Sequence, residues 1–212
     1  MASSGDDRDQ HRPGPRLRAD ARRNYAAILE AARDLFVERG AGAPLEEVAR
    51  RAGVGIGTLY RRFPDRDALL REVVLEALAR SYASAERART SAEDGLGGLE
   101  RYMRDALDLR ISAIIPLALD RIDMDAPEVA AAREASASSV ERLIAAAHED
   151  GSRPETVTFA DIGTLLVRLS RPLPGSVPAD LDSELAHRHL DLVLAGLRSA
   201  GPDLFDRAGD DV

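Results

Sequence analysis

The chain of 212 residues has 44 % apolar residues, 31 % charged residues and a formal net charge of −8. It contains no cysteine, which excludes disulfides, thiolate metal sites and cysteine nucleophiles. No apolar run approaches the ~20 residues that a membrane span needs, and the polar N-terminus has no apolar signal-peptide core. We therefore expect a soluble cytoplasmic protein with no membrane partner.

Two features of the composition bear on fold and partner. The apolar residues are mostly Ala and Leu, which favour helices, and aromatic residues make up only 4 %, so an all-α fold is expected. Residues 1–90 hold 17 Arg against 14 Asp and Glu, whereas residues 91–212 are strongly acidic. This asymmetry favours an approach of only the first part to phosphate, although ordinary solvated helices would explain it equally well.

The N-terminal segment, residues 1–20, is rich in charge, Pro and Gly and is predicted to be a disordered arm. Its Arg side chains could reach a DNA groove or simply remain solvated. From about Ala21 to Arg39, apolar residues recur at steps of three and four, which predicts an amphipathic helix. Gly40 is its expected stop.

Two short helices are predicted next, from about Pro44 to Ala52 and from Ile56 to Phe63, joined by a turn at Gly53. Such a pair forms a helix-turn-helix. The side chains expected to pack inward are those of Val48, Ala49, Val54, Leu59 and Phe63. The opposite face of the second helix combines a Tyr with two Arg, which suits phosphate contacts and leaves small residues near base edges.

The segment Leu45 to Leu69, LEEVARRAGVGIGTLYRRFPDRDAL, resembles the DNA-binding signature of TetR-family transcriptional regulators. The segment Ile28 to Gly40 is similar to the same family. The resemblance implies that the helix from Ile56 enters the major groove and that Arg66 contacts a phosphate. It also implies no catalytic residue. The predicted DNA-binding residues are Gly55, Ile56, Gly57, Thr58, Tyr60, Arg61, Arg62 and Arg66.

Further helices are predicted at about 66–89, 97–114, 116–123, 126–149, 158–170 and 180–200, with Pro116 as one of the breaks between them. The expected organisation is an arm (1–20), a helix-turn-helix domain (21–66), a connecting helix (67–90), a regulatory and dimerisation domain (91–201) and a flexible tail (202–212).

By resemblance, the last two helices pair with those of a second subunit to form a homodimer. The interface residues predicted from this are Phe159, Ile162, Leu166, Leu169, Leu185, Leu192, Val193 and Gly196. An intramolecular core would show the same periodicity. The helices at 97–149 are expected to enclose a small-molecule effector, with Tyr102, Met103, Ala106, Ile114, Met124, Ile144 and Phe159 as wall residues.

The resemblance thus implies a ligand-responsive repressor that a small molecule releases from a palindromic double-stranded DNA operator. No cofactor or metal is expected. The alternatives are a helical protein-interaction module and a small helical enzyme. The polar clusters that an enzyme could use are weak, because His187 and His189 lie two residues apart and point to different faces of a helix.

Overall fold

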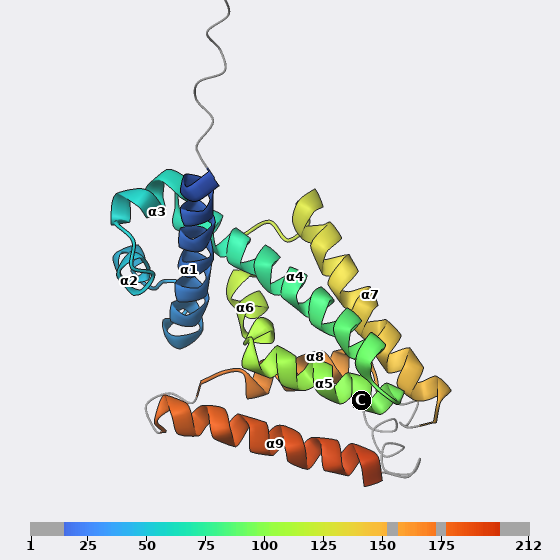
Figure 1. Cartoon of the computed structure of the whole chain (residues 1–212). Helices are drawn as coiled ribbons and strands as arrows, with labels where there is room; N and C mark the ends of the chain where they lie inside the picture. Colours follow the sequence, from blue (N-terminus) through green and yellow to red (C-terminus); the bar gives the residue numbers. More distant parts are fainter. Residues whose placement is uncertain (1–14, 152–156, 173–176, 200–212) are drawn as a thin grey trace, which may run out of the picture.

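The computed structural model of the chain describes residues 15–151, 157–172 and 177–199, which fold into helices and confirm the all-α prediction (Figure 1). The helices are α1 (Pro15–Arg39), α2 (Leu45–Arg51), α3 (Ile56–Arg62), α4 (Arg66–Ser91), α5 (Gly95–Asp108), α6 (Ile111–Ala118), α7 (Pro127–Glu149), α8 (Phe159–Leu169) and α9 (Ala179–Ser199). Helices α1 to α3 gather at the N-terminal end of α4, and the long α9 runs along the opposite side of the molecule (Figure 1).

Two boundaries differ from the predictions. Helix α1 begins at Pro15 rather than near Ala21, so residues 15–20 are helical and only residues 1–14 of the predicted arm lie outside the described residues. Proline is well suited to the first helical position, where its missing N–H costs nothing. Pro116 lies inside α6, since the chain instead turns at Arg110, whose φ of 49° is left-handed. The tail, 202–212, also lies outside the described residues.

Helix α4 connects two apolar cores. Its N-terminal half, with Leu69, Leu70 and Val73, packs with α1, α2 and α3 in the first core. Its C-terminal half, with Ala85 and Ala88, packs with α5, α7, α8 and α9 in the second. One continuous helix therefore contacts both parts of the chain. The exact domain boundaries stay a prediction.

The start of α5 lies against the backbone of α7. A Cβ atom added at Gly95 would lie 2.3 Å from the backbone nitrogen of Ala147 and 2.5 Å from the carbonyl carbon of Ala146. Such an approach is possible only for a residue without a side chain, and backbone atoms cannot rotate away as a flexible side chain can. Gly95 therefore sets how closely α5 and α7 pack.

We expect Gly95→Ala to lower the free energy of unfolding by about 1–3 kcal/mol, because the two helices must separate to admit the methyl group. Urea denaturation monitored by circular dichroism measures this change. The matched control is Gly163→Ala in α8, where an added Cβ meets no atom within 4 Å. The control should keep or raise stability by about 0.5–1 kcal/mol, since Ala favours a helix over Gly. Equal midpoints for both variants would contradict the close-packing argument.

Candidate DNA-binding site

The turn between α2 and α3 has the geometry that the sequence predicts. Gly53 adopts a left-handed φ of +68°, which a residue with a side chain rarely adopts. The backbone N–H of Val54 then donates to the carbonyl of Ala49 at 3.0 Å and holds the turn closed. This hydrogen bond fixes the direction in which α3 leaves α2.

The inner faces of the two helices are fully packed. Val48, Ala49, Leu59 and Phe63 are 2 % exposed or less, and the partly buried Val54 packs against the same core. The predicted inward set is therefore confirmed. Because α3 has only two turns, burying this face leaves the other face directed to solvent.

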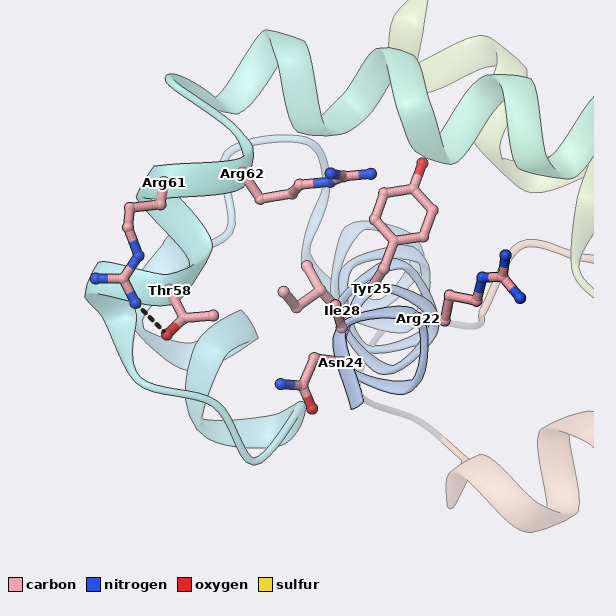
Figure 2. Close-up of a pocket in the computed structure, with 8 residues that line it drawn as sticks. Arg22, Asn24, Tyr25, Ile28, Thr58, Arg61 and Arg62 are labelled. Carbon is pink, nitrogen blue, oxygen red and sulfur yellow. Dashed lines mark hydrogen bonds between the residues drawn. The ribbon is translucent and has the colours of Figure 1, made fainter. Parts of the chain in front are cut away.

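The open face of α3 presents an aromatic and a basic side chain. Tyr60 is 47 % exposed and Ile56 is 38 % exposed, and the neighbouring Arg61 is also exposed. One guanidinium nitrogen of Arg61, Nη2, donates to Thr58 Oγ1 at 2.9 Å (Figure 2). Gly55, which precedes α3, and Gly57 in its first turn are exposed as well, so no side chain covers the backbone there. These six predicted residues share one accessible surface.

Arg62 and Arg66, which the sequence also predicts to contact DNA, do not lie on this open face of α3. The guanidinium of Arg62 lies 4.8 Å from the ring centroid of Tyr25 in α1, on the other side of α3 from Arg61 (Figure 2). Arg66 Nη1 donates to the carbonyl oxygens of Ala41, at 3.3 Å, and of Ala43. In this structure Arg62 thus links α3 to α1 through a cation–π contact, and Arg66 stabilises the loop between α1 and α2 through hydrogen bonds.

A groove of about 530 Å³ separates the start of α1 from α3 and is lined by Ala21, Arg22, Asn24, Tyr25, Ile28, Thr58, Arg61 and Arg62 (Figure 2). Asn24 leaves α1 on the side that faces α3 (Figure 2). Arg22 and Asn24 were not among the predicted DNA-binding residues, although the sequence placed both in the helix from about Ala21 to Arg39. Guanidinium and amide donors around a groove are suited to bind phosphate oxygens.

Tyr25 joins this groove to α4. Its ring stacks on Phe63 with centroids 5.8 Å apart, and its hydroxyl donates to Glu72 Oε2 at 2.5 Å. Burial, together with the hydrogen bond to and the negative charge of Glu72, raises the pKa of Tyr25 from 10.0 to about 12, and the nearby Arg62 opposes this shift. Tyr25 therefore remains neutral and continues to donate to Glu72 well above neutral pH.

This shift predicts a pH dependence of stability. Above pH 10 the unfolded chain loses the Tyr25 proton, whereas the folded chain retains it up to about pH 12, so the free energy of unfolding should fall as the pH rises between these values. Urea unfolding between about pH 10 and pH 12 measures the slope, which should be shallower in Tyr25→Phe. The exposed Tyr82 offers a matched control as Tyr82→Phe, and the same slope in both variants would exclude Tyr25 as its cause.

A second hollow lies where α4, α5, α6, α7 and α8 meet and measures about 200 Å³. Of the predicted effector-site residues, Tyr102 and Phe159 line it. The others do not line it and are core residues: Met103, Ala106, Ile114 and Ile144 are buried, and Met124 packs against the first core. Helical periodicity marks a residue as inward but does not distinguish core from cavity wall. The wall residues that the sequence reasoning missed include Ser81, Ser112 and Ser136.

Helix α9 has apolar residues on two faces. Leu190, Leu194 and Leu197 are buried against the rest of the chain, whereas Leu181 and Leu192 are 44 % and 71 % exposed. Leu181 and Leu192 lie eleven positions apart, close to three full turns, so they share one face. Of the remaining predicted dimer residues, Gly196 and Phe159 are exposed, and Leu169, Leu185 and Val193 are half-buried.

Two of the predicted dimer residues are unavailable to a partner. Ile162 and Leu166 in α8 are 2 % and 1 % exposed and line the 200 Å³ cavity within the chain. Their assignment to a dimer surface is therefore wrong, because the face of α8 that bears them packs onto the second core. At these two positions, the alternative of a core within one chain is correct.

Among the residues that the structure describes, no group of three or more His, Cys, Asp or Glu side chains could hold a metal ion. His187, one of the polar residues weighed for an enzyme, instead lies 2.8 Å from a carboxylate oxygen of Asp108. None of the described helices combines the length and the apolar character needed to cross a membrane.

Comparisons with known proteins agree with this geometry. A model of the bacterial regulatory proteins of the tetR family matches residues 28–73, which cover the C-terminal half of α1, all of α2 and α3, and the start of α4. An HTH-type transcriptional regulator of Staphylococcus aureus (strain USA300) is 39 % identical over 59 residues, 27 % of this chain and 32 % of that protein. This match thus spans about a third of the length of the curated relative.

Solved structures extend the likeness over the whole fold. The TetR transcriptional regulator SCO0520 from Streptomyces coelicolor is 31 % identical, with a TM-score of 0.59 over 82 % of this chain and 99 % of that one. A TetR transcription regulatory protein from Mycobacterium vanbaalenii has the same identity and TM-score over 86 % and 99 %. LfrR from Mycobacterium smegmatis, solved with proflavine, shares the fold at 22 % identity and a TM-score of 0.63 over 85 % and 97 %. The chain belongs to the TetR family of transcriptional regulators, which are DNA-binding regulators rather than enzymes.

Proposed function

We propose that the chain is a ligand-responsive repressor that binds a palindromic operator as a homodimer and is released by a small molecule. The observation that carries the DNA-binding part is the contrast between neighbours in α3: Leu59 is fully buried and Tyr60 is 47 % exposed. A two-turn helix anchored so firmly on one side offers a rigid reading surface on the other. That surface consists of Gly55, Ile56, Gly57, Thr58, Tyr60 and Arg61. Residues of the groove beside α1 contact the phosphates of the DNA backbone.

A single α3 helix makes too few contacts for tight binding, since one good bidentate contact between a side chain and a base contributes about 1–3 kcal/mol. A twofold dimer supplies two such helices, and successive half-sites on one face of DNA lie about 34–36 Å apart. The open face of α9, with Leu181 and Leu192, supports dimerisation because a solvated stripe of Leu opposite a packed stripe is unusual in a monomer. Gly196, one turn after Leu192, extends this surface.

The ligand response is supported by the path of α4. Leu78 and Ser81 in α4 line the 200 Å³ cavity, and Leu69 and Leu70 of the same helix pack in the first core beneath α3. A molecule that changes the position of α4 in the cavity would therefore also change the placement of α3. Such a molecule regulates only if it binds the two arrangements with different affinity. The likeness in fold to LfrR, solved with proflavine, is in keeping with a site of this kind.

The test uses the full chain and DNA from upstream of its own coding region. Fluorescence anisotropy against random DNA of equal length should show specific binding, and nuclease footprinting should reveal a site with twofold symmetry. The logarithm of the affinity should fall linearly with the logarithm of salt concentration, as expected for Arg–phosphate contacts. Equal affinity for random DNA and every upstream fragment, or an asymmetric footprint half a site long, would contradict the proposal.

A further inference from the structure

We infer that the effector is a compact, uncharged and mostly apolar molecule with one hydrogen-bond acceptor, which is held by the hydroxyls of Ser81 and Tyr102; this rests on the proposed ligand response. The relevant site is the partly open cavity of about 200 Å³ between α4, α5, α6, α7 and α8, whose wall residue Phe159 is 41 % exposed. Three properties of its wall lead to this class of ligand: volume, absence of charge and an incompletely used row of hydroxyl groups.

The volume limits the size of the ligand. Drug-sized ligands occupy pockets of roughly 300–1,000 Å³, and a cavity of about 150 Å³ suffices for benzene. A cavity of 200 Å³ therefore accommodates one six-membered ring with a small substituent. Phe159 and Tyr102 lie on its wall, so a planar ring can pack against aromatic faces.

The wall excludes a charged ligand. Its lining residues are apolar, Gly, Ser or Tyr, and none of them is ionised at neutral pH. An isolated carboxylate or ammonium moved from water into such a site loses its hydration with no counter-charge in return. On the neighbouring helices, Arg142 pairs with Glu86 and Arg104 pairs with Asp191 at the surface.

The polar part of the wall consists of the half-buried Ser112 and a row of three buried hydroxyls. Ser136 Oγ donates to Ser81 Oγ at 2.8 Å, and Ser81 Oγ lies 3.0 Å from the Tyr102 hydroxyl. Two hydrogen bonds among three hydroxyls use two protons, and these groups have no further partner in the described part of the chain. One O–H, on Ser81 or Tyr102, has no acceptor within the row and can therefore donate to an acceptor on the ligand.

The tyrosine supports this assignment. Burial raises the pKa of Tyr102, with the Ser81 hydrogen bond acting weakly in the opposite direction, so its hydroxyl is protonated and able to donate. Ser81 lies on α4, the helix that also packs beneath α3. A ligand acceptor bound by this row would therefore contact the connecting helix directly.

The experiment compares three near-isosteric probes by calorimetry on the full chain: acetophenone, which has a neutral acceptor, cumene, which has none, and benzoate, which is charged. We expect acetophenone to bind about 5- to 10-fold more tightly than cumene, as one neutral hydrogen bond allows. Benzoate should bind about 100-fold more weakly than acetophenone, or not detectably. Benzoate binding as tightly as acetophenone, or no binding of acetophenone and cumene at millimolar concentration, would overturn the ligand class.

Variants locate the donor. Ser81→Ala combined with Tyr102→Phe and Ser136→Ala removes both candidate donors, together with the Ser136 hydroxyl that would otherwise lose its acceptor and become a new donor. This triple variant should reduce acetophenone affinity to that of cumene, with cumene affinity unchanged. Ser136→Ala is the matched control, because Ser81 and Tyr102 still share one hydrogen bond and keep one spare proton. Retained preference for acetophenone in the triple variant would overturn the role of the row. Because the probe series needs only the native chain, the ligand class stays testable even if a variant fails to fold.

The same probes in the DNA-binding assay separate this inference from the proposed function. Acetophenone that binds but leaves operator affinity unchanged would support the ligand class and contradict the ligand response. Release of DNA by benzoate and not by acetophenone would support the response and overturn the class.

Discussion

Operator affinity is expected to fall by about 30-fold or more in Tyr60→Ala and in Arg61→Ala, with the fold and the oligomeric state unchanged. Each side chain is exposed on the open face of α3 and has no role in the first core. One contact contributes about 1–3 kcal/mol, and a symmetric dimer loses it twice, so about 2–6 kcal/mol is at stake. Fluorescence anisotropy on the upstream fragment measures the loss.

The two variants should differ in their dependence on salt. Arg61→Ala removes one cation per subunit and should reduce the salt slope by about two if that cation neutralises a phosphate. Tyr60→Ala removes no charge and should leave the slope unchanged. The matched controls are Tyr82→Ala in α4, where the side chain is 43 % exposed, and Arg133→Ala in α7. Native affinity in both α3 variants, or equal losses in the controls, would show that α3 does not contact DNA.

The helix-turn-helix could be predicted from sequence because its determinants are local. Gly53 supplies the left-handed turn within a segment of some twenty residues, and the positions of Leu59 and Phe63 set the buried face of α3. The direction of Arg62 could not be predicted in this way, because it depends on Tyr25, which lies 37 positions earlier. Adjacent Arg residues look equivalent in a sequence, yet both are exposed here and have different partners: Arg61 donates to Thr58, and Arg62 lies over the Tyr25 ring.

The regulatory part was predictable only as a set of helices. Ile162, Leu166 and Leu192 have similar chemistry and helical spacing, but the first two line a cavity within the chain and the third is 71 % exposed. Which face of α8 or α9 meets the core depends on how several distant helices pack together. The hydroxyl row was not anticipated either, since Ser81 and Ser136 lie 55 positions apart and a Ser in a helix gives no signal of its neighbours.

The open face of α9 predicts a second large loss of operator affinity, through the loss of dimerisation. Leu192→Glu should convert the dimer to a monomer at micromolar concentration, because a twofold interface would have to bury two carboxylates without partners. A monomer offers a single α3 to DNA, so operator affinity should fall by about 100-fold or more. Light scattering coupled to size-exclusion chromatography gives the mass, and anisotropy gives the affinity.

The fold of the subunit should survive this change, because Leu190 and Leu194 on the opposite face of α9 still pack into the second core. Leu119→Glu, at a leucine that is 56 % exposed next to α6, is the matched control and should leave both the mass and the affinity as in the native protein. A dimer mass for Leu192→Glu would place the subunit interface on another surface. A monomer that still binds the full site with native affinity would instead remove the need for a dimer altogether.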